Sequence, residues 1–189
     1  AFFTAQFPDF VPLMPDLAAQ FAAHPQGQLA TLHCWPWHAS RTLLIGDAAH
    51  AIVPFHGQGL NCGFEDCLLL DRLLAGQSDV AAAFGEFEHQ RRTNTDAIAI
   101  MAIENYQEMR DTVRSPDFER RKHLANELER RFPGRFIPRY SMVMFHHEIP
   151  YSVALQRGLT QSGILDELTQ RATTLGEVDF TGAAALIEA

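Results

Sequence analysis

The stretch LLIGDAAHAIVPFHGQGLNCGFEDC, residues 43–67, decides how this sequence is interpreted. It begins with a short apolar run, Leu43 to Ile45, which predicts a buried strand that ends at Gly46. Asp47 is therefore expected at the C-terminal end of a strand, the edge at which open α/β sheets bind ligands. Aspartate is also a common turn residue, so this position alone leaves a purely structural role equally open.

Two glycines then lead into a predicted helix. Gly57 and Gly59 flank Gln58 and allow backbone conformations and close approaches that a side chain would block. Asn61 is the expected N-cap of a helix that runs to about Leu74. A glycine loop before a helix presents unpaired N–H groups and a positive dipole end to an electron-rich or anionic ligand. The chain has no G-x-G-x-x-G and the loop no Gly-Lys-Ser/Thr, so the contact differs from the known phosphate-binding loops.

These residues resemble the second flavin motif of the single-component FAD-dependent aromatic hydroxylases. The resemblance rests on GDAAH at 46–50, Pro54, and GQGLN at 57–61. Two later stretches, ENYQEMRD at 104–111 and FPGRFIPRYSMVMFHHEIPY at 132–151, resemble the members of this group that hydroxylate kynurenine. The flavin motif indicates only the broad family, whereas the later stretches indicate the substrate.

The resemblance implies an α/β flavoprotein monooxygenase fragment. It predicts the end of a substrate-domain segment at residues 1–40, an FAD-binding strand-loop-helix at 41–75, and a mainly α-helical C-terminal region covering the active site at 76–189. Family members begin with a βαβ unit that carries G-x-G-x-x-G and holds the ADP part of FAD. That unit is not in these 189 residues. We therefore expect the chain to be the C-terminal portion of a longer enzyme, to need the N-terminal part as its partner, and to bind FAD weakly alone.

The resemblance also assigns cofactor contacts. Asp47 would accept hydrogen bonds from the ribityl hydroxyls of FAD. The N–H groups near Gly59, Leu60 and Asn61 would face the pyrimidine edge of the isoalloxazine, where negative charge gathers on reduction. The complete expected set is Gly46, Asp47, Pro54, Gly57, Gln58, Gly59, Leu60 and Asn61.

Five further residues are implied at the substrate. Phe55 and His56 would border the flavin ring and the substrate, with an ordinary polar loop role as the other interpretation of His56. Asn105 and Tyr140 would bind the amino-acid head group of L-kynurenine, because an amide and a phenol supply donors and acceptors without charge. From the residues alone, both would more simply be buried polar groups. Met109 lies four residues beyond Asn105 on the same helix face, with core packing equally open.

The implied activity is hydroxylation of L-kynurenine to 3-hydroxykynurenine by an FAD enzyme that consumes NADPH and O2. Such an enzyme must orient the ring and exclude water, so no catalytic acid, base or nucleophile is predicted in this chain. Two alternatives stay open: a related hydroxylase with another substrate, and a non-catalytic interaction module.

Composition and spacing exclude several other classes of protein. The net charge of −8 argues against nucleic-acid binding. The three cysteines have no metal spacing and suit a reducing compartment, and neither His50/His56 nor His146/His147 has zinc-motif geometry. No apolar run is long enough for a membrane span, and the acidic end GEVDFTGAAALIEA does not resemble the anchor of animal family members. We therefore expect a soluble, cytoplasmic, bacterial-type form without metal.

The hydrophobic pattern predicts mainly helices after residue 75. Prolines break residues 2–23 into short helices, and alternation at 29–34 predicts a strand. The helix at 80–109 is expected to bury Phe84, Phe87, Ile98, Met101 and Ile103. A charged helix is predicted at 117–131, a loop at 132–138 and a helix at 151–169, whereas 140–145 fits either a strand or a helix.

Overall fold

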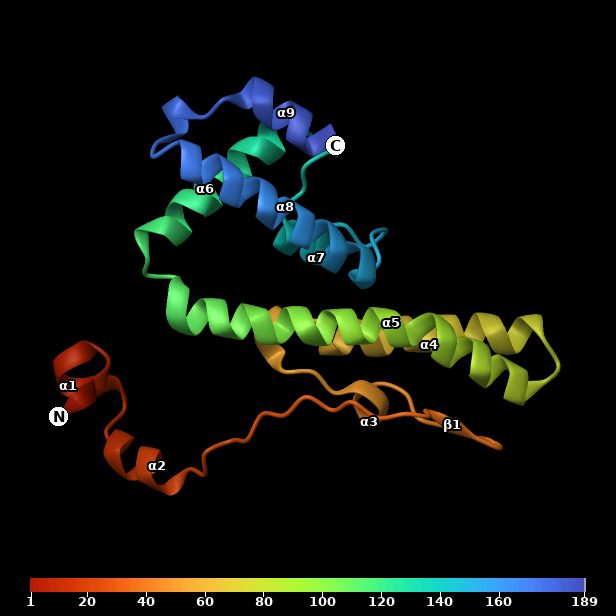
Figure 1. Ribbon diagram of the computed structural model, residues 1–189. Coiled ribbons are helices and arrows are strands. Elements are labelled where there is room, and N and C mark those ends of the chain that lie inside the picture. The colour runs from red at the N-terminus through yellow and green to blue at the C-terminus, as the bar shows by residue number, and fades with distance from the viewer. Residues whose placement is uncertain (189) are drawn as a thin grey trace.

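One long helix, α5 (Val80–Gln107), runs through the middle of the molecule, as Figure 1 shows for the computed structural model, which describes residues 1–188. Helix α4 (Gly59–Gly76) packs beside it. The helices that follow α5 lie on one side of this pair, and the N-terminal quarter of the chain lies on the other (Figure 1). The prediction of a mainly helical C-terminal region is confirmed.

The N-terminal segment consists of short helices that bury no side chain. They are α1 (Phe2–Gln6), the 3-10 turn η1 (Val11–Leu13) and α2 (Leu17–Ala23), as the prolines predict. The predicted strand at 29–34 is wrong, because this segment is extended without a strand beside it within residues 1–188. Its backbone makes one bond to a distant segment, from the Leu32 N–H to the Ala51 carbonyl at 2.8 Å.

A two-residue ladder precedes the flavin-like stretch. β1 (His38–Ala39) pairs antiparallel with β2 (Thr42–Leu43). The expected buried strand at 43–45 is wrong: the strand ends at Leu43, and Leu44 and Ile45 are 37% and 36% exposed. Within residues 1–188 the sheet consists of these two strands alone, and no element buries the Leu44 and Ile45 side chains.

The glycine stretch folds into two short helical turns before α4. They are α3 (Asp47–His50) and the 3-10 turn η2 (Pro54–His56). Gly57 then takes a left-handed conformation with φ of 65°, and α4 begins directly afterwards with Gln58 as its N-cap. The expected N-cap Asn61 is therefore wrong, since the left-handed glycine turns the chain into the helix earlier.

Helix α5 confirms the long helix predicted after residue 80. The Asp79 carboxylate caps its start by accepting hydrogen bonds from the N–H groups of Ala81 at 2.9 Å and Ala82 at 3.2 Å. The α-helix ends two residues before the expected Met109 and continues as the π-helical turn η3 (Glu108–Thr112).

The C-terminal half forms a second group of helices. Helix α6 (Pro116–Arg131) and the loop after it agree with the predictions. Helix α7 (Arg139–Phe145) shows that the ambiguous segment 140–145 is helical, with Met142 and Val143 buried. The chain ends in α8 (Tyr151–Arg171), the 3-10 turn η4 (Leu175–Glu177) and α9 (Phe180–Glu188).

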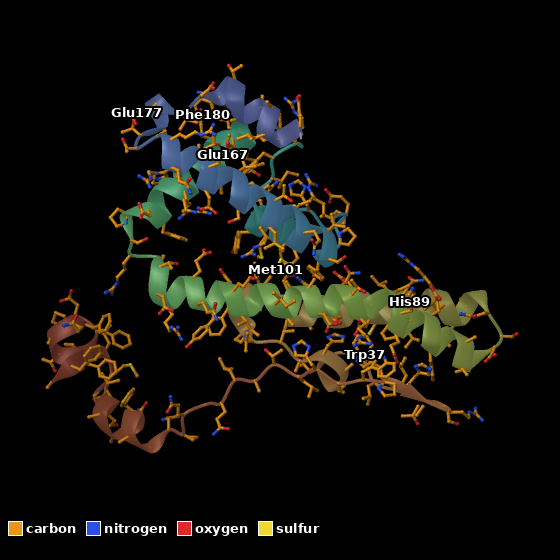
Figure 2. All side chains as sticks on the ribbon, viewed as in Figure 1. Trp37, His89, Met101, Glu167, Glu177 and Phe180 are labelled. Carbon is orange, nitrogen blue, oxygen red and sulfur yellow. The ribbon has the colours of Figure 1, made fainter. Side chains whose placement is uncertain are left out.

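Three apolar clusters hold these elements together. The first joins α4, α5, α7 and α8 around Ile98 and Met101, and the second joins α6, α8 and α9 around Leu128. The third packs Trp37 against Phe87 on the opposite side of α5 (Figure 2). Of the predicted buried face of α5, Phe87, Ile98 and Met101 are confirmed, Phe84 is half-buried, and Ile103 is wrong because it is 39% exposed.

Candidate functional site

The turn that carries Asp47 is anchored by a buried carboxylate from α4. Gly46 has φ of 57° and ψ of −142°, and its N–H donates to Asp66 Oδ2 at 2.9 Å. Asp66 is fully buried, whereas Asp47 is exposed at the first position of α3. The backbone before Asp47 is therefore fixed while its carboxylate faces outward, as a ligand contact requires.

Asp66 is the centre of a buried ionic network. His50 Nε2 lies 2.7 Å from Asp66 Oδ2, and Arg91 Nε donates to Asp66 Oδ1 at 2.7 Å. Arg91 also donates to Glu65 Oε2 at 2.6 Å and to the Cys62 carbonyl at 3.2 Å. Burial acts to raise the pKa of Asp66, but the hydrogen bonds from His50 and from the Gly46 backbone outweigh it and hold the pKa below its ordinary value. Asp66 is therefore ionised at neutral pH.

The first turn of α4 presents unpaired backbone donors. The first N–H with an intrahelical partner is that of Cys62, which donates to the Gln58 carbonyl at 2.9 Å. The N–H groups of Gly59, Leu60 and Asn61 precede it, and no side chain among residues 1–188 caps the helix. These N–H groups are the donors expected to face a flavin, and the Leu60 side chain beside them is 70% exposed.

The Gln58 side chain is engaged inside the protein. It is 4% exposed, and its Oε1 accepts hydrogen bonds from the Tyr151 hydroxyl at 3.1 Å and from Asn61 Nδ2 at 2.8 Å. Tyr151 belongs to α8, so this contact ties the start of α4 to the C-terminal helices. Gln58, one of the expected cofactor contacts, can therefore contact a ligand only through its backbone.

Four expected substrate residues come together from three elements. In η2, the Phe55 carbonyl accepts a hydrogen bond from Asn105 Nδ2 of α5 at 2.6 Å. The His56 ring stacks on the Tyr140 ring of α7, with centroids 5.6 Å apart and an interplanar angle of 24°. The Phe55 ring also packs on Tyr106, with centroids 4.6 Å apart. Residues that are 50 or more positions apart in the sequence therefore meet in one place, which we call the substrate surface.

His56 is buried, and its Nδ1 has no hydrogen-bond partner in the described part of the chain. Burial lowers the pKa of His56, and the nearby positive charge of Arg139 lowers it further. The ring is therefore neutral at pH 7, which suits a stacking surface rather than a charged contact.

The remaining expected residues lie in or next to η2 and in η3. Pro54 begins η2 and is exposed, and Gly57 ends η2 with its left-handed turn. Met109 is 55% exposed and lies in η3, one element beyond Asn105. Tyr140 is 53% exposed, so its hydroxyl-bearing ring is accessible.

A separate cavity of about 500 Å³ lies between the start of α4 and the α7–α8 loop. Its lining includes Gln58, Arg91, Asn94, His146 and Tyr151, and none of the expected substrate residues contributes to it. The substrate surface of η2, α5 and α7 is therefore distinct from this cavity.

Two kinds of feature are not found in residues 1–188. No group of three or more His, Cys, Asp or Glu side chains is placed to hold a metal ion. No helix of that span combines the length and the apolar character needed to cross a bilayer.

The buried Asp66 network was not among the predicted site residues. Its members lie on α3, α4 and α5, and 25 positions separate Asp66 from Arg91. The one signal in the sequence was the presence of charged Asp66 and Arg91 within helices that also bury apolar side chains.

Known proteins are similar to this chain both in the flavin-like stretch and along its whole length. Residues 17–93, which include the expected FAD-binding segment 41–75, match the family model described as FAD binding domain. The chain is 50% identical over 188 residues to kynurenine 3-monooxygenase of Myxococcus xanthus, covering 99% of this chain and 40% of that protein. It is 47% identical over 190 residues to kynurenine 3-monooxygenase of Stenotrophomonas maltophilia, covering 100% of this chain and 42% of that protein. The chain thus spans about two fifths of the length of the curated relatives it matches. Along its length the chain is similar to proteins named kynurenine 3-monooxygenase, and residues 17–93 match the FAD binding domain model.

Proposed function

We propose that the protein carrying this chain is an FAD- and NADPH-dependent monooxygenase that hydroxylates L-kynurenine to 3-hydroxykynurenine. The observation that carries the proposal is the junction of the flavin-like stretch with the expected substrate residues: Asn105 holds the Phe55 carbonyl, and Tyr140 stacks on His56. The names of the relatives support the same activity. Residues 41–75 would contact the flavin, and the helices after residue 75 would cover the active site.

The residues of the flavin-like stretch fit FAD. The unpaired N–H groups at the start of α4 match the oxygen and nitrogen acceptors at the pyrimidine edge of a flavin. The exposed Asp47 carboxylate matches ribityl hydroxyls, which need an acceptor. When bound, FAD would supply the redox chemistry that moves one oxygen atom of O2 onto the aromatic ring, with NADPH as the source of electrons.

The substrate surface fits an aromatic amino acid. Asn105 donates through Nδ2 to Phe55, which leaves its Oδ1 to accept a hydrogen bond from an ammonium group. The exposed Tyr140 hydroxyl can donate to a carboxylate. The Phe55 ring and the exposed Tyr140 ring, which the buried neutral His56 supports from one side, offer flat faces against which an aminobenzoyl ring can stack.

These residues would act by orientation and by exclusion of water. They would hold the substrate ring in a fixed position, and the helices after residue 75 would limit solvent access to it in the complete protein. No proton transfer by a side chain of this chain is required.

The cysteines Cys34, Cys62 and Cys67 form no disulfide with one another, which supports a reducing, cytoplasmic setting for the protein.

Binding of L-kynurenine to the FAD-loaded complete protein tests this proposal. Titration followed by flavin absorbance should show saturable binding that Tyr140→Ala weakens about tenfold or more. His147→Ala, at a fully exposed histidine outside the substrate surface, is the matched control and should bind as the wild type does. Unchanged binding by Tyr140→Ala, together with tight binding of another aromatic compound, would instead indicate a related hydroxylase.

A further inference from the structure

We propose that Asp66 is a positioning residue for the cofactor: its carboxylate holds Gly46 and His50, at the two ends of α3, so that Asp47 in α3 is presented to FAD. This inference rests on the proposed function, because it requires a flavin at Asp47. It adds to that function a role for a buried residue that touches neither cofactor nor substrate.

The first step of the argument is where the Asp66 carboxylate binds. Its Oδ2 receives hydrogen bonds from Gly46 N at 2.9 Å and from His50 Nε2 at 2.7 Å. Gly46 immediately precedes the four-residue helix α3, and His50 is its last residue. One oxygen atom therefore holds both ends of the turn that carries Asp47.

The second step is how the carboxylate itself is held. Arg91 Nε donates to Asp66 Oδ1 at 2.7 Å, and Arg91 is fixed in turn by Glu65 and by the Cys62 carbonyl. Both side chains of the central pair are buried, with Asp66 at 0% and Arg91 at 6% exposure. Buried ion pairs often stabilise a fold no more than apolar packing does, so the gain from this pair is the fixed geometry.

The third step is the weakness of the turn without Asp66. Its local bonds are those from the Ala49 and His50 N–H groups to the Gly46 carbonyl, both at 2.9 Å. A single turn of helix is unstable alone. Gly46 also has φ of 57°, and glycine adopts many other conformations at little cost. The orientation of Asp47 therefore depends on the contact from α4.

The test compares two buried carboxylates in the complete protein. Asp66→Asn replaces one acceptor oxygen by a donor, so it cannot satisfy Gly46, His50 and Arg91 together. We expect the dissociation constant for FAD, measured by titration of the apoprotein, to rise about tenfold or more, and the visible circular dichroism of bound flavin to change.

Glu88→Gln is the matched control. Glu88 is also buried, and its Oε2 accepts a hydrogen bond from Trp37 N at 2.8 Å and lies 2.8 Å from His38 Nδ1. It thus makes the same two kinds of contact, but to Trp37 and to His38 of β1 rather than to Gly46 and His50. Glu88→Gln should lower the melting temperature while leaving the FAD dissociation constant within about twofold of the wild type.

A second pair of variants tests the inference if Asp66→Asn does not fold. His50→Leu removes the donor to Asp66 and should weaken FAD binding at least about threefold, whereas His50→Gln keeps an N–H donor and should restore most of the affinity. The inference is overturned if Asp66→Asn binds FAD as the wild type does, if Glu88→Gln weakens binding equally, or if His50→Leu and His50→Gln bind alike. A wild-type protein that does not bind FAD would contradict the proposed function itself, before any variant is compared.

Discussion

At the residue scale, the candidate substrate surface depends on single contacts between distant parts of the chain. Asn105 is the clearest case, because its Nδ2 fixes the Phe55 carbonyl at 2.6 Å and its Oδ1 is assigned to the substrate head group. Asn105→Ala should raise KM for L-kynurenine about tenfold to a hundredfold, as expected for the loss of one hydrogen bond to a charged group and of the support for η2. Steady-state kinetics of the FAD-loaded protein measures this change.

Asn94→Ala is the control for that experiment. Asn94 is on the same helix, but its Oδ1 accepts hydrogen bonds from the Ser152 backbone at 3.1 Å and hydroxyl at 3.0 Å. Its loss should lower stability by about 1 kcal/mol without changing KM. Equal effects of Asn94→Ala and Asn105→Ala on KM would show that Asn105 has only a structural role.

His56 gives the fold a pH dependence whose sign follows from its environment. Burial, followed by the charge of Arg139, lowers the pKa of His56 in the folded chain below its ordinary 6.5. The unfolded chain therefore binds a proton at higher pH than the folded chain does, so the free energy of unfolding decreases as pH falls below the unfolded pKa. Above that pKa, His56 is neutral in both states and contributes no pH dependence.

Denaturant unfolding between about pH 5 and 8 measures this dependence. His56→Gln should flatten the decrease in stability at the acid end of the range. The fully exposed His147 provides the control, because His147→Gln should leave the slope unchanged. A slope unaffected by His56→Gln would mean that other groups cause it.

At the element scale, the position of α7 depends on its contact with α8. Arg139 at the start of α7 forms an ion pair with Glu104 and packs against Gly158. A Cβ at residue 158 would lie 2.5 Å from Arg139 Cδ and 2.9 Å from its Cγ. Gly158→Ala should therefore displace α7 and lower the free energy of unfolding by about 1–3 kcal/mol, measured by denaturant titration.

Gly163→Ala is the paired variant on the same helix. Nothing lies within 4 Å of a Cβ at residue 163, so alanine there should stabilise α8 by about 1 kcal/mol through its higher helix propensity. If both variants changed stability in the same direction and by the same amount, the close approach of Arg139 to Gly158 would not limit packing.

Elements with strong periodicity were predictable from the sequence, whereas elements defined by their neighbours were not. The charged face of α6 carries a helical repeat, whereas α5 was predictable as a long stretch without proline, and it buries side chains on two sides. A strand at 29–34 was expected from local alternation and one at 43–45 from an apolar run. A strand requires a partner, and in the described structure only Leu43 of these residues belongs to a ladder. Residues 140–145 became helical through the burial of Met142 and Val143 against other helices.

In the candidate site, too, local patterns were predictable from the sequence and contacts between distant residues were not. The residues of the flavin-like stretch are contiguous, so their spacing and resemblance indicated them. The Asp66–Arg91 pair could not be predicted, because no local pattern specifies a contact between α4 and α5. The start of α4 at Gln58 was also missed, since it depends on the left-handed backbone of Gly57 rather than on a capping side chain.

At the scale of the whole molecule, α8 belongs to two apolar clusters and α5 packs on both sides. The face of α5 that carries Met101 contributes to the cluster with α7 and α8, and the face toward Trp37 contributes to the cluster beneath it (Figure 2). Because α8 also contributes to the cluster with α6 and α9, the helices after residue 80 should unfold in one cooperative transition.

Two neighbouring substitutions test this arrangement. Met101 is 0% exposed, so Met101→Ala should lower the free energy of unfolding by about 2–5 kcal/mol in a single transition. Ile100 is 45% exposed, and Ile100→Ala should change it by no more than about 0.5 kcal/mol. Calorimetry that resolved two transitions in Met101→Ala would contradict a shared core.

The most direct test of the central claim is product formation by the complete protein. We predict that, with FAD and NADPH in air, addition of L-kynurenine accelerates NADPH oxidation and yields 3-hydroxykynurenine, identified by chromatography and mass. Omission of FAD from the apoprotein should abolish the product. NADPH oxidation that does not respond to L-kynurenine, with no hydroxylated product formed, would contradict the proposed function.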